Sequence, residues 1–480
     1  MAINVRPFDR EQLFLMPPSV GDWLPDGHLA WFVLDVVSEL DLAAFYGGHR
    51  EDGRGGAVYD PAVMLAILIY AYCVGERSSR RIERRLVEDV AFRVVAANQC
   101  PDHATLARFR GRHQDAMTEL FSQVLGLCVA EGLVAAGVVA IDGTKVEANA
   151  SAWSNRTRRQ IAEEILAEAE RVDAAEDELL GDRRGDELPE RWADRRDRRS
   201  RLREALRQLD AQGAADWETY MAERAAKEAA AGRKLPGRKP AADSRKGKDR
   251  HANTTDPDSR MLRARNRFVQ GYNAQAAVSE DHVILAAEVT NAANDTTCFE
   301  PLAVAATENL ADTGAEPVGV FVADAGYWST DNASLSLDPE ILIAPVPATN
   351  GITDAADPRF AKRQRVLARL AAGKISVQQA ADEMGISTAR TYQLLRLYRS
   401  DGPDPTQVRA AMEQRLASDA GAAAYAKRKI TVEPVFGNIK ANLRFRRFSR
   451  RALPAVTSEW RLICATHNLL KLRRHQMAIA

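Results

Sequence analysis

Three carboxylates in three separate sequence contexts could do chemistry together. Asp142 follows the apolar run Gly137–Ile141, and Asp324 follows a second apolar run, Val318–Ala323. Glu433 lies in Val-Glu-Pro-Val-Phe-Gly-Asn-Ile-Lys, within a stretch dense in Arg and Lys. Two buried strands that deliver aspartates to one sheet edge, together with a glutamate from a helix, would form a set of hard oxygen ligands. Such a set suits Mg²⁺, and a pair of Mg²⁺ ions suits phosphodiester chemistry.

Two of these carboxylates also have an ordinary interpretation. Asp142 stands in an Asp-Gly pair, a strong hairpin signal, so a turn residue is the alternative. Glu433 could be a surface residue, since Lys427–Arg451 contains nine Lys or Arg and one acid. On a helix, Glu433, Phe436 and Lys440 would share one face, which offers a carboxylate to a metal and an ammonium to a phosphate. The apolar positions that would pack away from this face are Val432, Val435 and Ile439.

Length and composition set the limits of the interpretation. The chain has 480 residues, 46% of them hydrophobic, so a sizeable core and about three domains are expected. The 66 basic and 66 acidic residues cancel, so any nucleic-acid binding must depend on local patches. Five scattered cysteines without a Cys-x-x-Cys pair favour a reducing cytoplasm over a disulfide framework. No signal peptide is evident, and the most apolar segment, Ala62–Val74, is too short to span a membrane.

Element signals predict an α/β protein with helical inserts. Residues 268–278 and 282–290 alternate in the manner of a hairpin, and residues 318–324 read as a strand buried on both faces. We expect a sheet with an antiparallel start and a parallel continuation. The predicted segments are helices in 1–135, a first strand in 136–155, a charged helical insert and basic linker in 156–255, the main sheet in 256–350, a second insert in 351–420 and helices in 421–480.

Two helical regions are candidates for DNA contact. The basic helix that begins near Pro101 carries Arg108 and Arg110, which either are solvated or contact phosphates. The segment Ile375–Leu395 is typical of a helix-turn-helix, with Gly385 at the turn. Plain helical hairpins give a similar pattern. Ala381 would allow close helix approach, and Ile386 and Leu394 would pack inward; the residues expected to face outward are Ser387, Thr388, Arg390, Thr391 and Gln393.

Taken together, these pieces resemble the DDE transposases of bacterial insertion sequences, which have a ribonuclease-H-like catalytic domain and a helical amino-terminal domain. The resemblance extends over most of the chain. The matching segments are Pro101–Arg110, Ile141–Ser151, Asp256–Arg260, Gln270–Gln275, Ala323–Ser329, Val432–Lys440 and Trp460–Leu472.

The resemblance implies that Asp142, Asp324 and Glu433 form the catalytic, metal-binding triad, which would hold two Mg²⁺ ions, with Mn²⁺ able to substitute. Relatives carry a Tyr-x2-Arg-x3-Glu-x6-Lys signature around the last acid. Here the Glu-to-Lys spacing matches, but the Arg-to-Glu spacing is one residue longer. The resemblance places four residues on DNA near the cleavage point: Tyr425, Arg428, Lys429 and Lys440.

Two further features adjoin these segments. Tyr327 and Trp328 follow Asp324 and could stack on a flipped base, although core packing is the alternative for Trp328. The pair Asn294-Asp295 is similar to a polar pair near the sheet in this family, and the sequence assigns it no role.

The implied activity is binding of terminal inverted repeats, cleavage of DNA and transfer of its 3′ ends to a target. Double-stranded DNA is then the partner, and the resemblance implies a homodimer on DNA, in the cytoplasm and at the nucleoid, without a membrane partner. The first alternative is a DNA-binding protein derived from such a transposase that has no catalysis. The second is another metal-dependent phosphoryl-transfer enzyme, such as a nuclease or a phosphatase.

Overall fold

The computed structural model describes residues 19, 22–47, 58–165, 167, 198–231, 251–264, 267–346, 358–386, 388, 391, 395 and 405–479. Within these residues, no helix is both long enough and apolar enough to cross a membrane.

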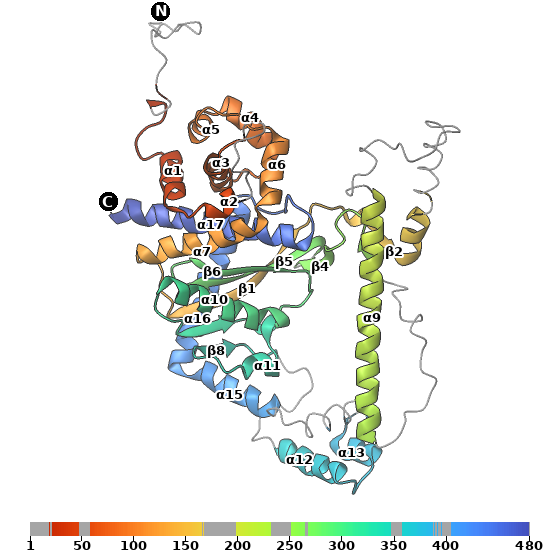
Figure 1. Cartoon of the computed structure of the whole chain (residues 1–480). Helices are drawn as coiled ribbons and strands as arrows, with labels where there is room; N and C mark the ends of the chain where they lie inside the picture. The colour runs from red at the N-terminus through yellow and green to blue at the C-terminus, as the bar shows by residue number, and fades with distance from the viewer. Residues whose placement is uncertain are drawn as a thin grey trace, which may run out of the picture.

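A mixed β-sheet lies at the centre of the molecule (Figure 1). Its strands are β1 (Val138–Glu147), β4 (Arg260–Ala264), β5 (Arg267–Ser279), β6 (Ile284–Thr290), β7 (Val320–Ala323) and β8 (Glu340–Ile343). Their order is β4-β5-β1-β7-β8, and β6 also pairs with β5. β5 is antiparallel to its three partners, whereas β7 is parallel to β1 and β8 is parallel to β7. The α/β class and the antiparallel-then-parallel sheet are therefore confirmed.

Asp142 lies inside a continuous strand, so the hairpin interpretation of Asp-Gly is wrong. The pairing of β1 with β5 runs unbroken from Val139 to Glu147, with Asp142 opposite Ala276. A Cβ at the next position, Gly143, would collide with the Gln275 side chain of β5 unless that side chain moved. β1 is fully buried over its first four residues, and Asp142 follows them at a partly buried position.

The amino-terminal helices share one hydrophobic core with the sheet. They are α1 (Leu29–Glu39), α2 (Ala43–Tyr46), α3 (Pro61–Cys73), α4 (Ser79–Glu88), α5 (Val90–Val95), α6 (His103–Arg112) and α7 (Gln114–Ala130). α3 is buried on nearly every side, and its first turn is capped by the Asp60 side chain, which accepts a hydrogen bond from the Ala62 amide. α7 packs against helices α10 (Phe299–Thr313) and α17 (Leu453–Ile479). The described residues of 1–135 therefore have no core separate from that of the sheet.

Helices from the second half of the chain cover the sheet. α10 packs on β6, β5 and β1, α16 (Asp419–Gly437) packs on β1, β7 and β5, and α17 packs on β6. A π-helical turn, η8 (Asn438–Asn442), continues α16. Shorter elements are η6 (Thr296–Cys298), η7 (Ala325–Tyr327), α11 (Thr330–Ala333) and α15 (Pro405–Ala417).

Two inserts have small cores of their own. The first contains η2 (Ala152–Ser154), β2 (Asn155–Thr157), α9 (Arg198–Ala231) and β3 (His251–Asn253), and Figure 1 shows α9 standing beside the sheet. Ile161 packs there with Leu202 and Leu209 of α9. The helix predicted for this insert is therefore present in its described part. The predicted basic linker falls outside the described residues. The second insert contains α12 (Pro358–Ala371) and α13 (Val377–Met384), which pack on each other.

Candidate active site

Asp142 and Asp324 lie side by side at the level where two parallel strands meet. Ile141 of β1 is in register with Ala323, the last residue of β7, so Asp142 is the next residue of β1 and Asp324 directly follows β7. Neighbouring strands are about 4.8 Å apart, so the two carboxylates share one small region. Asp324 also caps η7, since its Oδ1 accepts a hydrogen bond from the Gly326 amide at 2.8 Å. The sequence expectation that two strands bring aspartates together agrees with this register.

The electrostatic environment of Asp142 opposes its ionisation. Burial raises the pKa of Asp142 to about 6, and the nearby negative charges of Asp324 and Asp295 act in the same direction. Two interactions lower the pKa: a hydrogen bond from the Gly143 amide at 2.7 Å and the guanidinium of Arg428, whose Nη1 is 3.4 Å from Oδ2. This carboxylate would gain from a further cation, because a positive charge favours the ionised form.

Helix α16 and the π-helical turn η8 that continues it supply polar groups that face this side of β1. Arg428 is buried against Asp142 and hydrogen-bonds with Tyr425. Lys440 donates from Nζ to the Thr144 hydroxyl at 2.5 Å and to the Lys145 carbonyl at 2.9 Å. These expected DNA-binding residues therefore have contacts within the protein, and Arg428 is buried where an exposed DNA contact was expected.

Glu433 is exposed on α16 and does not complete a triad in this structure. Among all the residues described, no group of three or more His, Cys, Asp or Glu side chains could hold a metal ion. Helical geometry explains the placement, since Glu433 is five residues beyond Arg428 and so is rotated by about 140° from it. The predicted inward positions are confirmed, because Val432, Val435 and Ile439 are buried; Phe436, expected on the functional face, is also buried and stacks on Trp460.

A second polar cluster lies under the opposite face of β1. Asp295 Oδ1 accepts hydrogen bonds from Lys145 Nζ at 3.1 Å, Asn273 Nδ2 at 2.6 Å and Gln275 Nε2 at 2.8 Å. Successive strand residues point to opposite faces, which separates Lys145 from Asp142 although both lie on β1. Asn273 is fully buried, and its Oδ1 has no hydrogen-bond partner among the described residues. Asp295, given no role by the sequence, thus anchors the network beneath the aspartate pair.

The expectation that Tyr327 stacks on a base is wrong. Tyr327 is fully buried, its hydroxyl donates to Gln275 Oε1, and its ring meets Phe299 edge-on. Trp328 is partly buried and packs against the main core. Both rings therefore support the sheet edge that carries Asp324, in agreement with the core-packing alternative.

Three family models match separate parts of the chain. A model described as a transposase domain (DUF772) matches residues 18–112, a homeodomain-like domain matches residues 357–407, and a transposase DDE domain matches residues 399–473. Together, these matches support an insertion-sequence transposase of the DDE type. The DDE model covers α15, α16 and α17 as far as residue 473 and so includes Glu433, whereas both aspartates lie outside the three matched ranges. No curated protein and no solved structure is similar enough to count as a match.

The homeodomain-like region of this transposase contains the turn predicted from the sequence. α13 begins at a capping box formed by Ser376 and Gln379 and ends at Gly385, whose φ of 67° favours glycine. Thr391 was expected to face outward, but it is fully buried. Arg390, the proposed DNA contact of the following helix, lies outside the described residues, as does Leu394.

The remaining expected DNA contacts of the transposase differ in exposure. Arg108 of α6 and Lys429 of α16 are exposed and available to a ligand. Arg110 is buried, which corrects the expectation of a surface contact. Its guanidinium donates to the Tyr72 hydroxyl at 3.3 Å and to the Arg77 carbonyl at 3.1 Å, and it also bonds the Ser79 hydroxyl.

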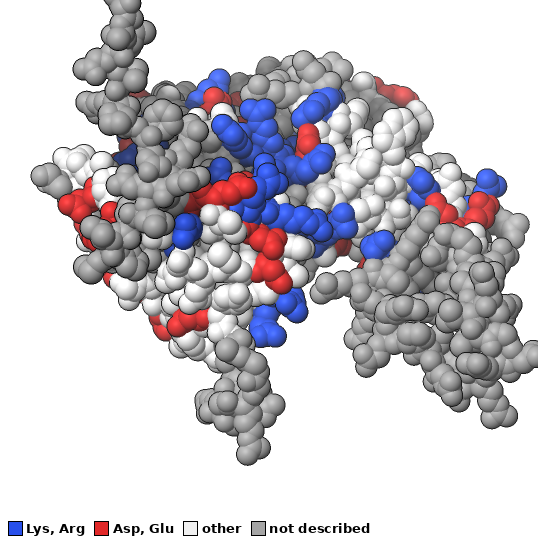
Figure 2. Space-filling view, turned by 90° about the horizontal axis from the view of Figure 1, so that it is seen from above, with Lys and Arg blue, Asp and Glu red and all other residues white. Residues whose placement is uncertain are grey.

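A cationic groove that was not expected from the sequence lies between α4, α6 and the segment after η8. We call it the arginine groove; it has a volume of about 560 Å³, and its cationic lining includes Arg77, Arg80, Arg81, Arg447 and Arg450. Helices α4 and α6 lie at the top of Figure 1, and Figure 2, seen from that side, shows Lys and Arg gathered in a band. The sequence contains the runs Arg80-Arg81 and Arg446-Arg447. It does not show that residues of these two runs, about 370 positions apart, line the same groove.

Proposed function

We propose that this transposase binds the terminal inverted repeats of its element and performs Mg²⁺-dependent DNA cleavage and strand transfer. The register that sets Asp142 beside Asp324 carries the proposal, because carboxylates paired across adjacent parallel strands suit divalent-ion phosphodiester chemistry. The arginine groove and the homeodomain-like region support a polynucleotide as the substrate.

The strand arrangement supports a ribonuclease-H-like catalytic domain. Read across the sheet, the order β6-β5-β1-β7-β8 has three antiparallel strands followed by two strands parallel to β1. The first aspartate lies on the central strand and the second follows its parallel neighbour. This is the arrangement that the resemblance to transposases led us to expect.

The residues present fit Mg²⁺. Mg²⁺ is commonly bound by one or two carboxylates together with waters and substrate phosphates, so Asp142 and Asp324 suffice for a first ion in the presence of DNA. Burial and the neighbouring carboxylates raise the pKa of Asp142 in spite of Arg428, so a bound cation would favour its ionised form. When bound, such ions activate the attacking oxygen and stabilise the leaving one. Mn²⁺ would substitute for Mg²⁺ because it accepts the same oxygen ligands.

The chain's own residues then have distinct tasks. Asp142 and Asp324 would hold the first ion when DNA is bound. Arg428 fixes the carboxylate of Asp142 at 3.4 Å and, with Tyr425, positions it. Lys440 ties the end of α16 to β1 through Thr144. Glu433 would complete the shell of the second ion only if α16 turns when DNA binds.

Substitution of the acidic residues tests the proposal. We expect Asp142→Asn, Asp324→Asn and Glu433→Gln each to abolish Mg²⁺-dependent cleavage of a linear DNA that carries the ends of the element. Loss of a direct ligand should cost more than the roughly 10–100-fold typical of residues that only orient ligands. Cleavage is measured on denaturing gels, and binding to the same DNA, which should be retained, is measured by fluorescence anisotropy.

The matched control is Asp331→Asn, which alters an exposed aspartate seven residues beyond Asp324. It should cleave as the wild type does. A fully active Asp324→Asn variant would overturn the assignment of the pair. A wild-type protein that binds the end DNA and leaves it uncut with both Mg²⁺ and Mn²⁺ would support the alternative, a DNA-binding protein without catalysis.

The resemblance also leads us to propose a homodimer on DNA, because strand transfer of an element requires its two ends to be held together. The reaction would take place in the cytoplasm, at the nucleoid. Sedimentation of the protein with and without end DNA tests the dimer.

A further inference from the structure

Trp153 and Phe268 are large aromatic side chains that the fold leaves in solvent. Trp153 is 89% exposed and Phe268 is 67% exposed, although they come from segments 115 residues apart. Both line one cavity of about 510 Å³, which we call the aromatic pocket. Single exposed apolar residues are common on proteins, but two rings lining one cavity indicate a surface that receives a ligand.

The backbone that carries Trp153 is held firmly. The Ser151 hydroxyl accepts a hydrogen bond from the Trp153 amide at 3.2 Å, and the Trp153 carbonyl accepts one from Arg156 at 2.6 Å. The buried Asn253 side chain donates to the Ser151 carbonyl at 2.8 Å. The indole is therefore presented to solvent by a well-bonded turn, so a partner would meet an ordered platform.

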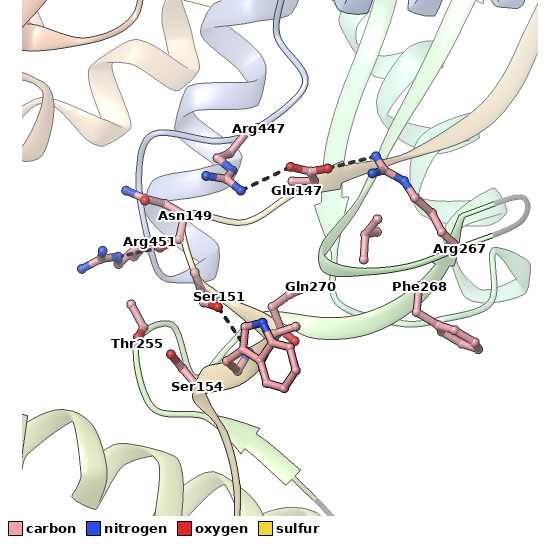
Figure 3. Close-up of a pocket in the computed structure, with 14 residues that line it drawn as sticks. Glu147, Asn149, Ser151, Ser154, Thr255, Arg267, Phe268, Gln270, Arg447 and Arg451 are labelled. Carbon is pink, nitrogen blue, oxygen red and sulfur yellow. Dashed lines mark hydrogen bonds and ion pairs between the residues drawn. The ribbon is translucent and has the colours of Figure 1, made fainter.

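Charge in the aromatic pocket favours an anionic ligand. Its lining contains Arg267, Arg447 and Arg451 against one acid, Glu147, so three positive charges and one negative charge leave a net +2. Figure 3 shows Glu147 between Arg447 and Arg267, and the two ion pairs measure 3.4 Å and 3.0 Å. Arg451 is fixed through Nε, which donates to the Asn149 carbonyl at 2.9 Å.

The aromatic pocket continues the arginine groove. Asn149 and Arg447 line both cavities, so a strand that follows the groove with its phosphates reaches the aromatic rings directly. Glu147 at the end of β1 is five residues from Asp142, which corresponds to about 17 Å along the strand. The same length is about five nucleotides at 3.4 Å each.

We propose that the aromatic pocket takes an unpaired base of a DNA strand, which stacks on Trp153 while the arginine groove holds the adjoining phosphates. Aromatic platforms within cationic grooves bind single strands in this manner, because every base has a π-face. The inference rests on the proposed function, with DNA as the substrate, and it adds the surface along which one DNA strand lies. The positive charge around the two rings favours DNA over a second copy of the chain as the occupant. Other exposed apolar residues, such as Met261 and Ile430, do not line the pocket and so do not extend it into a larger apolar surface.

Equilibrium binding of the full chain to three labelled probes tests the inference. The probes are an oligothymidylate of about 15 nucleotides, a fully paired duplex of the same length, and an abasic strand with the same backbone. We expect Trp153→Ala to weaken binding of the oligothymidylate about tenfold, the effect of losing one base stack. Affinity for the duplex and for the abasic strand should not change, and Trp153→Phe should restore most of the loss because phenylalanine also stacks.

The matched control is Trp217→Ala, which removes a partly exposed tryptophan of α9 that packs on Tyr220; it should bind all probes as the wild type does. Equal weakening by Trp153→Ala on all three probes, or no weakening on any, would overturn the inference while leaving the proposed function in place. A change in oligomeric state by sedimentation, without a change in DNA affinity, would overturn it in favour of an interface between copies. A wild-type protein that binds none of the probes would contradict the proposed function itself.

Discussion

Two arginines on the same helix have opposite environments. Arg108 and Arg110 belong to one basic run in the sequence, and a pattern of charges alone treats them alike. In the structure, Arg108 is exposed, whereas Arg110 is buried among Tyr72, Arg77 and Ser79. A guanidinium offers five donors in a planar fork, so it can join several buried acceptors at once. Arg110 therefore connects α6 to α3 and α4.

Alanine substitution of these two arginines should separate stability from DNA binding. We expect Arg110→Ala to lower the free energy of unfolding by about 2–3 kcal/mol, because buried acceptors lose their donor. Arg108→Ala should change it by less than about 0.5 kcal/mol, as is usual for exposed positions, and should weaken DNA binding. Urea denaturation followed by circular dichroism gives the first quantity, and anisotropy gives the second. Equal destabilisation by the two variants would contradict this division.

At the candidate site, too, the sequence indicated the residue types but not which side chains meet. The residue types around Asp142 and Asp324 indicated metal chemistry from the sequence. The contacts of Arg428 with Asp142, and the outward position of Glu433, depend on the rotation of α16 about its axis. That rotation is set by the burial of Val432, Val435 and Phe436 in the common core. A helical wheel based only on Glu433 and Lys440 placed Phe436 on the functional face, whereas Phe436 is buried in the core.

At the scale of elements, α17 is the helix that joins the amino-terminal layer to the sheet. It packs against α7, α3 and β6. His467 lies buried at this junction, where its Nε2 hydrogen-bonds the His282 carbonyl at 3.0 Å and its Nδ1 meets the Asn438 amide at 3.1 Å. Burial lowers the pKa of His467 to about 4, so the ring is neutral in the folded protein at neutral pH.

The buried histidine predicts a loss of stability in acid. The unfolded chain takes up a proton on His467 below its ordinary pKa of 6.5, and the folded chain does so only near 4. Because the unfolded state then binds more protons, the free energy of unfolding should fall as pH drops from 6.5 towards 4. The shift is worth about 3 kcal/mol at most. Urea denaturation of the wild type and of His467→Gln at pH 7.0 and 4.5 measures it, and the variant should show the smaller fall.

His475→Gln is the control for this experiment. His475 lies on the same helix, is only partly buried, and contacts the Glu131 carbonyl near the end of α7. This variant should keep the pH profile of the wild type. If His467→Gln instead loses as much stability in acid as the wild type does, the acid sensitivity comes from other groups.

At the scale of the whole molecule, charge is unevenly distributed. The formal net charge is zero, yet six arginines from α4 and the residues before it, from α6 and from the segment after η8 line the arginine groove. Burial lowers the pKa of Arg77 and of Arg450, although the carboxylate of Glu459 acts in the opposite direction. A polynucleotide would add further negative charge beside these guanidinium groups. Net charge is therefore a poor guide to the partner of this protein.

DNA affinity should depend steeply on salt in spite of the zero net charge. If the groove arginines other than the buried Arg110 neutralise five phosphates, the logarithm of the binding constant should fall with the logarithm of salt concentration with a slope of about −4.5. Arg80→Ala should reduce this slope by about 1. The control is Arg207→Ala on α9, an exposed arginine paired with Glu204, which should keep the full slope. Anisotropy titrations over a range of salt concentrations measure it, and a flat response would contradict the groove as a DNA site.

Local sequence determined the elements and the kinds of chemistry available. Continuous apolar runs made β1 and β7 buried strands, Pro61 and Ser376 marked helix starts, and Gly385 ended α13, because these signals act between residues a few positions apart. Only the tertiary structure decided which distant groups meet. It set Asp142 beside Asp324, turned Glu433 outward, buried Arg110 and joined the arginine groove to the aromatic pocket. Strand register and helix rotation follow from packing of the whole core, and no local pattern carries that information.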